Sequence, residues 1–69
     1  MSWESKFVNY GVVKIEGEQV KVYYDQYSYV TISVGNQVTN ANWAGGELNI
    51  AMSDGKVRRY SDQYSYITI

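Results

Sequence analysis

The sequence contains no cysteine, no histidine and no proline. Without cysteine there is neither a disulfide framework nor a cysteine-based zinc site. Without histidine, a transition-metal site would have to be built from carboxylates alone. The absence of proline means that nothing forces a strand to the edge of a sheet. We therefore expect no metal and no cofactor. A chain of 69 residues without covalent staples is expected to need tight packing or an oligomeric partner.

The sequence also has no large excess of either charge and no long hydrophobic run. Six basic residues against seven acidic ones give a net charge of -1, which provides no general attraction to nucleic acid or to an anionic membrane. No apolar run approaches the ~20 residues of a membrane span, and Met1–Glu4 has no feature of a signal peptide. With 45% apolar residues, residues 1–69 are expected to form one soluble domain, cytoplasmic by default, with no membrane partner.

What the chain does contain is an internal repeat. The octapeptide Asp-Gln-Tyr-Ser-Tyr-Val-Thr-Ile at 25–32 returns at 62–69 with one change, from Val30 to Ile67. The offset is 37 residues, and nine of the thirteen positions ending in each octapeptide are identical. We therefore predict a duplicated unit of about 37 residues, with copies near 1–34 and 35–69.

The remaining residues favour β-structure. Valine, isoleucine, threonine and tyrosine dominate, and the apolar residues alternate with a period of two in 13–16 and 20–22. Gly-Gly and Asp-Gly pairs mark turns. The predicted strands lie near 6–16, 19–34, 37–43, 47–53 and 56–69. The expected fold is all-β, with five to six antiparallel strands in a hairpin-connected meander.

The second and fifth predicted strands are too long to run straight. Asp25-Gln26 and Asp62-Gln63 interrupt the alternation in the middle of each, and aspartate favours local hydrogen bonds to its own backbone. If these dipeptides are bends, the sheet curls into a small barrel or is strongly bent. If they are full turns, each unit is a three- or four-stranded sheet resembling a propeller blade, and two such units would have to oligomerise to close a ring.

Tyrosines form the only candidate recognition surface. Tyr27 and Tyr29 share one strand face in the first copy, and Tyr64 and Tyr66 repeat them in the second. Such rows can stack sugars or nucleobases, form a self-association face, or simply support the sheet as cross-strand pairs. Trp43 is expected to be either a core anchor or a contact for a partner.

The only basic cluster is Lys56, Arg58 and Arg59. It either contacts a phosphate or carboxylate beside the tyrosines or belongs to a solvated strand. Arg59 stands where the first copy has Val22 and should share the face of Val57. A charge there would be buried unless the strand bends, the face is open or a carboxylate pairs with it. Any asymmetric site should therefore lie at this difference between the copies.

The segment 67–69, Ile-Thr-Ile, is largely apolar and uncharged and would be a liability at a free sheet edge. We therefore expect this strand to be paired, either with the first strand or across a two-fold axis.

No catalytic motif is present, and we expect no enzyme activity. Asp25 and Asp62 are explained by turn chemistry without invoking a carboxylate pair. The leading hypothesis is a non-enzymatic interaction module whose partner is itself or another protein, contacted through a tyrosine-rich sheet face and an edge strand. One alternative is a small barrel that binds single-stranded nucleic acid or carbohydrate by aromatic stacking. The other is an engineered scaffold without a biological ligand.

Overall fold

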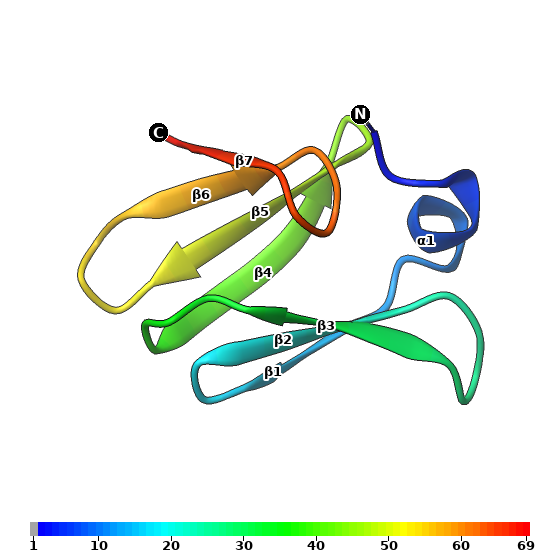
Figure 1. Ribbon diagram of the computed structural model, residues 1–69, viewed down its shortest axis with the longest axis horizontal. Coiled ribbons are helices and arrows are strands. Elements are labelled where there is room, and N and C mark those ends of the chain that lie inside the picture. Colours follow the sequence, from blue (N-terminus) through cyan, green and yellow to red (C-terminus); the bar gives the residue numbers. More distant parts are fainter. Residues whose placement is uncertain (1) are drawn as a thin grey trace.

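The computed structural model describes residues 2–69, which form two antiparallel sheets and one short helix (Figure 1). The elements in chain order are α1 (Ser5–Tyr10), β1 (Val13–Glu16), β2 (Gln19–Tyr23), β3 (Tyr29–Ser33), β4 (Val38–Ala44), β5 (Glu47–Met52), β6 (Val57–Tyr60) and β7 (Tyr66–Thr68). The first sheet has the order β1-β2-β3 and the second β4-β5-β6-β7. The all-β class is confirmed, but residues 2–69 form seven strands in two open sheets, with no closed barrel.

The predicted strand near 6–16 is wrong over its first half, where the chain forms α1. The helix ends at Gly11, which has a φ of 70° and donates its N–H to the Phe7 carbonyl at 2.9 Å, a left-handed cap that suits glycine. The buried Phe7 ring lies 5.1 Å from Trp3 and 5.2 Å from Tyr24. Strand preference depends strongly on context, and burial of this aromatic cluster overrides it in this segment.

The two long predicted strands are each divided by a full turn. Asp25 Oδ1 accepts the backbone N–H groups two and three residues later, at 2.8 and 2.7 Å. Asp62 Oδ1 does the same at 2.7 and 2.8 Å. These bonds reverse the chain, so that β2 pairs antiparallel with β3 and β6 with β7. Of the two possibilities left open by the sequence, the full turn is therefore the one that forms.

The hydrophobic core lies between the two sheets. Its largest fully buried side chains are Val20 and Val22 from the first sheet and Leu48 and Ile50 from the second. We call the sheet faces that carry these residues the inner faces and the opposite faces the outer faces. The other core residues are apolar side chains from the N-terminal segment, both sheets and the chain between them: Trp3, Phe7, Ile32, Val34, Val38, Met52 and Tyr60.

The β1–β2 hairpin and the β5–β6 hairpin differ in register by one residue. Two residues, 17 and 18, lie between the last paired residues of β1 and β2. Three residues, 53–55, lie between Met52 and Lys56, the last bonded pair of the β5–β6 hairpin. Val13 lies opposite Val22, whereas Ile50, which follows Val13 by 37 positions, lies opposite Arg58 and not Arg59. A one-residue slip moves apolar side chains to the other face of a sheet. Arg59 is consequently on the outer face, and the open face explains how its charge is accommodated.

Candidate functional site

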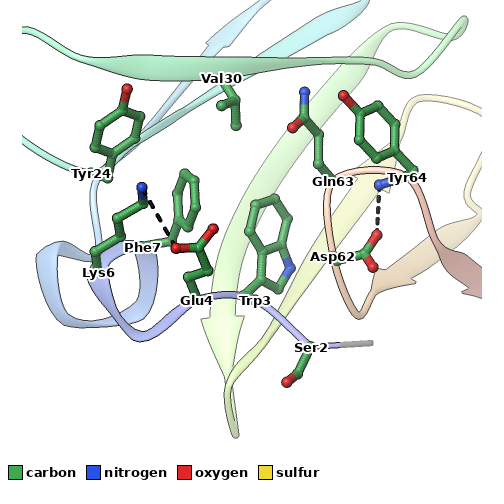
Figure 2. A pocket seen from close by; sticks show the side chains of 10 residues that line it. All are labelled: Ser2, Trp3, Glu4, Lys6, Phe7, Tyr24, Val30, Asp62, Gln63 and Tyr64. Atoms are coloured by element: carbon green, nitrogen blue, oxygen red, sulfur yellow. Dashed lines mark hydrogen bonds and ion pairs between the residues drawn. The ribbon is translucent and has the colours of Figure 1, made fainter.

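An open pocket of about 490 Å³ lies between the N-terminal segment, the first sheet and the loop that joins β6 to β7 (Figure 2). Its lining combines aromatic rings with acidic, basic and amide side chains. The lining residues are Ser2, Trp3, Glu4, Lys6, Phe7, Tyr24, Val30, Asp62, Gln63 and Tyr64. Small ligands bind preferentially in pockets of this kind, where apolar walls meet a few convergent polar groups at a junction between structural layers.

The N-terminal segment supplies one wall of the pocket. The indole N–H of Trp3 donates to the Tyr60 carbonyl at 3.1 Å and so attaches this segment to the second sheet. Lys6 Nζ lies 4.5 Å from the centre of the Tyr24 ring and 3.6 Å from the Glu4 carboxylate. Because Lys6 and Glu4 are exposed, their ion pair adds little stability. It does place one positive and one negative charge at the mouth of the pocket.

The turn after β6 supplies the opposite wall, as Figure 2 shows. The backbone N–H of Tyr64 donates to Asp62 and lowers the pKa of that carboxyl below its ordinary value. Gln63 Nε2 donates to the Thr31 carbonyl at 3.4 Å and ties this turn to β3. The Tyr64 side chain is 85% exposed. An exposed ring beside a carboxylate and an amide suits a hydroxyl-rich ligand better than an anion.

The predicted tyrosines of the first copy lie away from this pocket. Tyr27 is 82% exposed at the turn between β2 and β3. Tyr29 lies on the outer face of the first sheet, where its ring is 5.1 Å from that of Tyr23. Lys21 Nζ lies 4.9 Å from the Tyr29 ring, and Lys14 Nζ lies 5.7 Å from the Tyr23 ring. This face therefore carries two tyrosine rings in contact, tilted by 44° to each other, with a lysine over each.

In the second copy, Tyr64 lies exposed at the turn, whereas Tyr66 lies on the inner face of the second sheet and is 46% exposed. Tyr66 lies 4.9 Å from Tyr60, and the Arg58 guanidinium lies 4.5 Å from the Tyr66 ring. Arg58 Nη1 donates to the Val34 carbonyl at 2.9 Å and to the Tyr60 hydroxyl at 3.4 Å, and the latter bond raises the pKa of Arg58. A smaller cavity of about 300 Å³ lies beside this cluster. Arg58 thus joins the two sheets and does not stand free to meet a phosphate.

Arg59 and Trp43 occupy different places again. Arg59 Nε donates to Asn49 Oδ1 at 3.4 Å on the outer face of the second sheet. Trp43 is half-buried and packs against Trp3 with ring centres 5.3 Å apart. Its indole N–H is buried without a hydrogen-bond partner among residues 2–69. Trp43 therefore packs against the core, which is one of the two roles expected from the sequence.

A second candidate surface is the outer face of the second sheet at its β7 edge. Ile67 and Ile69 are 59% and 56% exposed, and the half-buried Val57 and Arg59 lie beside them on the same face. Within residues 2–69, β7 ends the strand order and pairs only with β6. An apolar edge strand of this kind is a ready template for association.

The structure thus spreads the predicted site residues over several places and brings only Tyr64 to the main pocket. Sequence reasoning missed Trp3, Phe7 and Gln63 as pocket residues. The signal for Gln63 was present in the repeated dipeptide, but its role depends on which sheet lies across from the turn. The positions of Trp3 and Phe7 depend on the helix, which the local residue preferences do not indicate.

Residues 2–69 contain no group of three or more acidic side chains placed to hold a metal ion. The part of the chain that the structure describes also has no helix long and apolar enough to cross a membrane. The chain matches no protein-family model, no curated protein and no solved structure.

Proposed function

We propose that the protein is a non-catalytic interaction module that associates with further copies of itself through its exposed sheet faces and the β7 edge. The observation that carries this proposal is an unequal covering of equivalent residues. Ile32 of the first copy is 3% exposed beneath the second sheet, whereas Ile69, 37 positions later, is 56% exposed. Val30 is likewise half-buried and Ile67 is 59% exposed. Exposed apolar surface of this kind marks an interaction site.

The proposal includes duplication of a blade-like unit. The cross-strand pair Tyr23–Tyr29 in the first sheet and the pair Tyr60–Tyr66 in the second are related by the same offset of 37 residues. The turns between them also make the same hydrogen bonds. Blade-like sheets bury both faces only when another blade lies on each side. One chain supplies two of them, so each has a face that remains for a partner.

Light scattering on the purified chain at several concentrations tests self-association. The wild type should give a mass that rises above the 7.9 kDa of one chain. Ile67→Lys should give a folded monomer, because a charge in an apolar interface is costly. Tyr10→Lys is the matched control, since Tyr10 is an exposed aromatic residue that belongs to α1 and to neither sheet. A folded wild type that stays monomeric at all concentrations would contradict the proposal.

Carbohydrate binding in the pocket of Figure 2 is the second candidate function. The pocket and the exposed Tyr64 favour it. Nucleic acid has less support, because Arg58 is engaged between the sheets and the net charge is -1. A glycan array with wild type, Tyr64→Ala and Tyr27→Ala tests the idea. The two tyrosines are almost equally exposed, but only Tyr64 lines the pocket, so binding that is lost in both variants or in neither would contradict it.

A further inference from the structure

The contact between the two sheets joins faces that are not equivalent. The inner face of the first sheet carries Val20 and Val22, whose counterparts 37 residues later, Val57 and Arg59, lie on the outer face of the second sheet. Conversely, Tyr60 on the inner face of the second sheet corresponds to Tyr23 on the outer face of the first. Within the chain, therefore, the Val20–Val22 face of the first sheet covers the Tyr60 face of the second. The two faces left open are the Tyr23 face of the first sheet and the Val57–Arg59 face of the second.

The polar contacts across the core show the same direction. Arg58 and Gln63 of the second sheet donate to backbone carbonyls of the first, at Val34 and Thr31. One copy of the octapeptide thus supplies the donor, Gln63, and the other copy supplies the acceptor, Thr31. The corresponding donor at the open end is Gln26, which is exposed. The corresponding acceptor at the other open end is the carbonyl of Thr68, in the exposed strand β7.

On the basis of the proposed self-association, we infer that copies of this chain stack head to tail. The outer face of the second sheet in one copy covers the outer face of the first sheet in the next, as the two inner faces cover each other within the chain. Gln26 of one copy then donates to the Thr68 carbonyl of its neighbour. Such a contact uses two different surfaces, so it closes into a ring or continues as a filament, and it has no two-fold axis.

The chemistry of the two open faces fits this arrangement. The outer face of the second sheet presents the Arg59 guanidinium with Ile67 and Ile69. The outer face of the first presents the rings of Tyr23 and Tyr29 with Lys14 and Lys21 over them. The Glu16 carboxylate on the same face lies 2.9 Å from Lys21 Nζ. Guanidinium groups stack on tyrosine and pair with carboxylates, and isoleucine packs against aromatic rings.

This arrangement also explains the main difference between the copies. Val22 faces the apolar surface formed by Leu48 and Ile50. These two residues lie on the inner face because the longer β5–β6 loop shifts the register of β5. Its counterpart Arg59 would face the outer surface of the first sheet, which carries tyrosines and charged side chains. A valine suits the first surface and an arginine suits the second. The difference between Val22 and Arg59 thus lies where the contact within a chain would differ from the contact between chains.

Two single-face variants test the direction of stacking. Ile67→Lys blocks the outer face of the second sheet, and Tyr29→Lys blocks that of the first. Head-to-tail stacking predicts that each variant alone is a folded monomer, checked by circular dichroism. It also predicts that an equimolar mixture forms a complex of two chains and no larger, because each variant keeps one working face. If β7 edges paired across a two-fold axis instead, Tyr29→Lys alone would still associate and the mixture would gain nothing.

Cysteine cross-linking gives a measurement that does not depend on blocked variants. The chain has no cysteine of its own, so Gln26→Cys and Thr68→Cys can be oxidised as a mixture without interference. Head-to-tail stacking predicts a disulfide between the two different variants. A disulfide formed by Thr68→Cys with itself, and not with Gln26→Cys, would overturn the inference while leaving self-association intact. A wild type that is monomeric by light scattering would instead overturn the proposed function.

Discussion

The two sheets contain the same hairpin in opposite orientations toward the core. In each, two tyrosines pair across the strands and a cation lies over the second ring, at 4.9 Å for Lys21 on Tyr29 and 4.5 Å for Arg58 on Tyr66. In the first sheet this cluster faces outward. In the second it lies on the inner face, where Tyr60 is only 2% exposed and Tyr66, on the edge strand, is 46% exposed. A hairpin with the same local chemistry can therefore present either face to the interior.

The difference arises outside the repeated hairpin. The β5–β6 loop leaves one more residue unpaired than the β1–β2 turn, and this shifts β5 so that Leu48 and Ile50 lie on the same face as Tyr60. In the first sheet, Val13 and Ile15 lie on the same face as Val22. Since a sheet packs on its apolar face, the neighbouring strand decides which side of the hairpin is buried. Burial here is therefore set by register and not by the repeated sequence.

Exchanging Val22 and Arg59 is the most severe test of this difference. Val22→Arg places an unpaired charge at a fully buried position, at a cost of several kcal/mol. The stability of a domain this small is itself only about 3–5 kcal/mol, so we expect the variant not to fold. Arg59→Val lies on the outer face and should change the free energy of unfolding by less than about 0.5 kcal/mol. Urea denaturation followed by circular dichroism measures both.

The two variants serve as controls for each other, because they interconvert the residues at equivalent positions of the two copies. A folded and stable Val22→Arg would show that the inner face of the first sheet is open to solvent. The assignment of inner and outer faces would then be wrong for both sheets.

Truncation of equivalent tyrosines should give the next largest effect. Tyr60→Ala removes a buried ring and should cost about 3–5 kcal/mol. Tyr23 is half-buried on the outer face, so Tyr23→Ala should cost roughly 1 kcal/mol. Thermal unfolding at a concentration where the protein is monomeric separates these values from any effect on association. Equal losses in the two variants would contradict the opposite orientations of the two hairpins.

Much of the fold could be predicted from the sequence, because its signals are local. Alternation, glycine turns and the repeated Asp-Gln dipeptide indicate antiparallel strands, and the turn chemistry of aspartate identifies where the chain reverses. The choice between a bend at Asp25 and a full turn remained open, since both use the same residues. The helix at 5–10 could not be predicted, because it depends on burial of Phe7 between Trp3 and Tyr24. Neither of these two residues belongs to the helical segment.

The candidate site was less predictable than the fold. The sequence indicates the tyrosine rows, because side chains alternate between the two faces of a strand. This alternation shows which residues share a face, but it does not show which face is buried. That information came from the register of β5, which depends on one residue in a loop. Arg58 was expected beside a ligand, and instead bonds to the Val34 carbonyl across the core. The pocket combines segments that are far apart in the sequence, so no spacing between residues could indicate it.

The two Asp-Gln turns, unlike the faces around them, should respond to pH in the same way. Backbone N–H groups lower the pKa of both Asp25 and Asp62. A carboxyl with a lowered pKa contributes stability that is fully present above its pKa in the unfolded chain, which is about 4. This stability is lost as the pH falls through the pKa of the folded state. Asp25→Asn and Asp62→Asn keep the oxygen acceptor but remove the charge, so each should flatten the acid side of the stability curve. Acid titration of the melting temperature measures this, and a curve that responds to only one of them would show that the turns are not alike.

The smallest expected effect distinguishes the two glutamines of these turns. Gln63 donates to the Thr31 carbonyl across the sheets at 3.4 Å, whereas Gln26 is exposed. In the monomer, Gln63→Ala should lower the free energy of unfolding by roughly 0.5–1 kcal/mol, and Gln26→Ala should leave it unchanged. In assembled protein the two variants should differ less in their loss of stability, because Gln26 would then make the equivalent contact with a neighbouring chain. We expect Gln26→Ala to weaken association roughly two- to tenfold, the value of one hydrogen bond. Concentration-dependent light scattering measures this, and unchanged association in Gln26→Ala would show that the contact between chains does not repeat the contact within the chain.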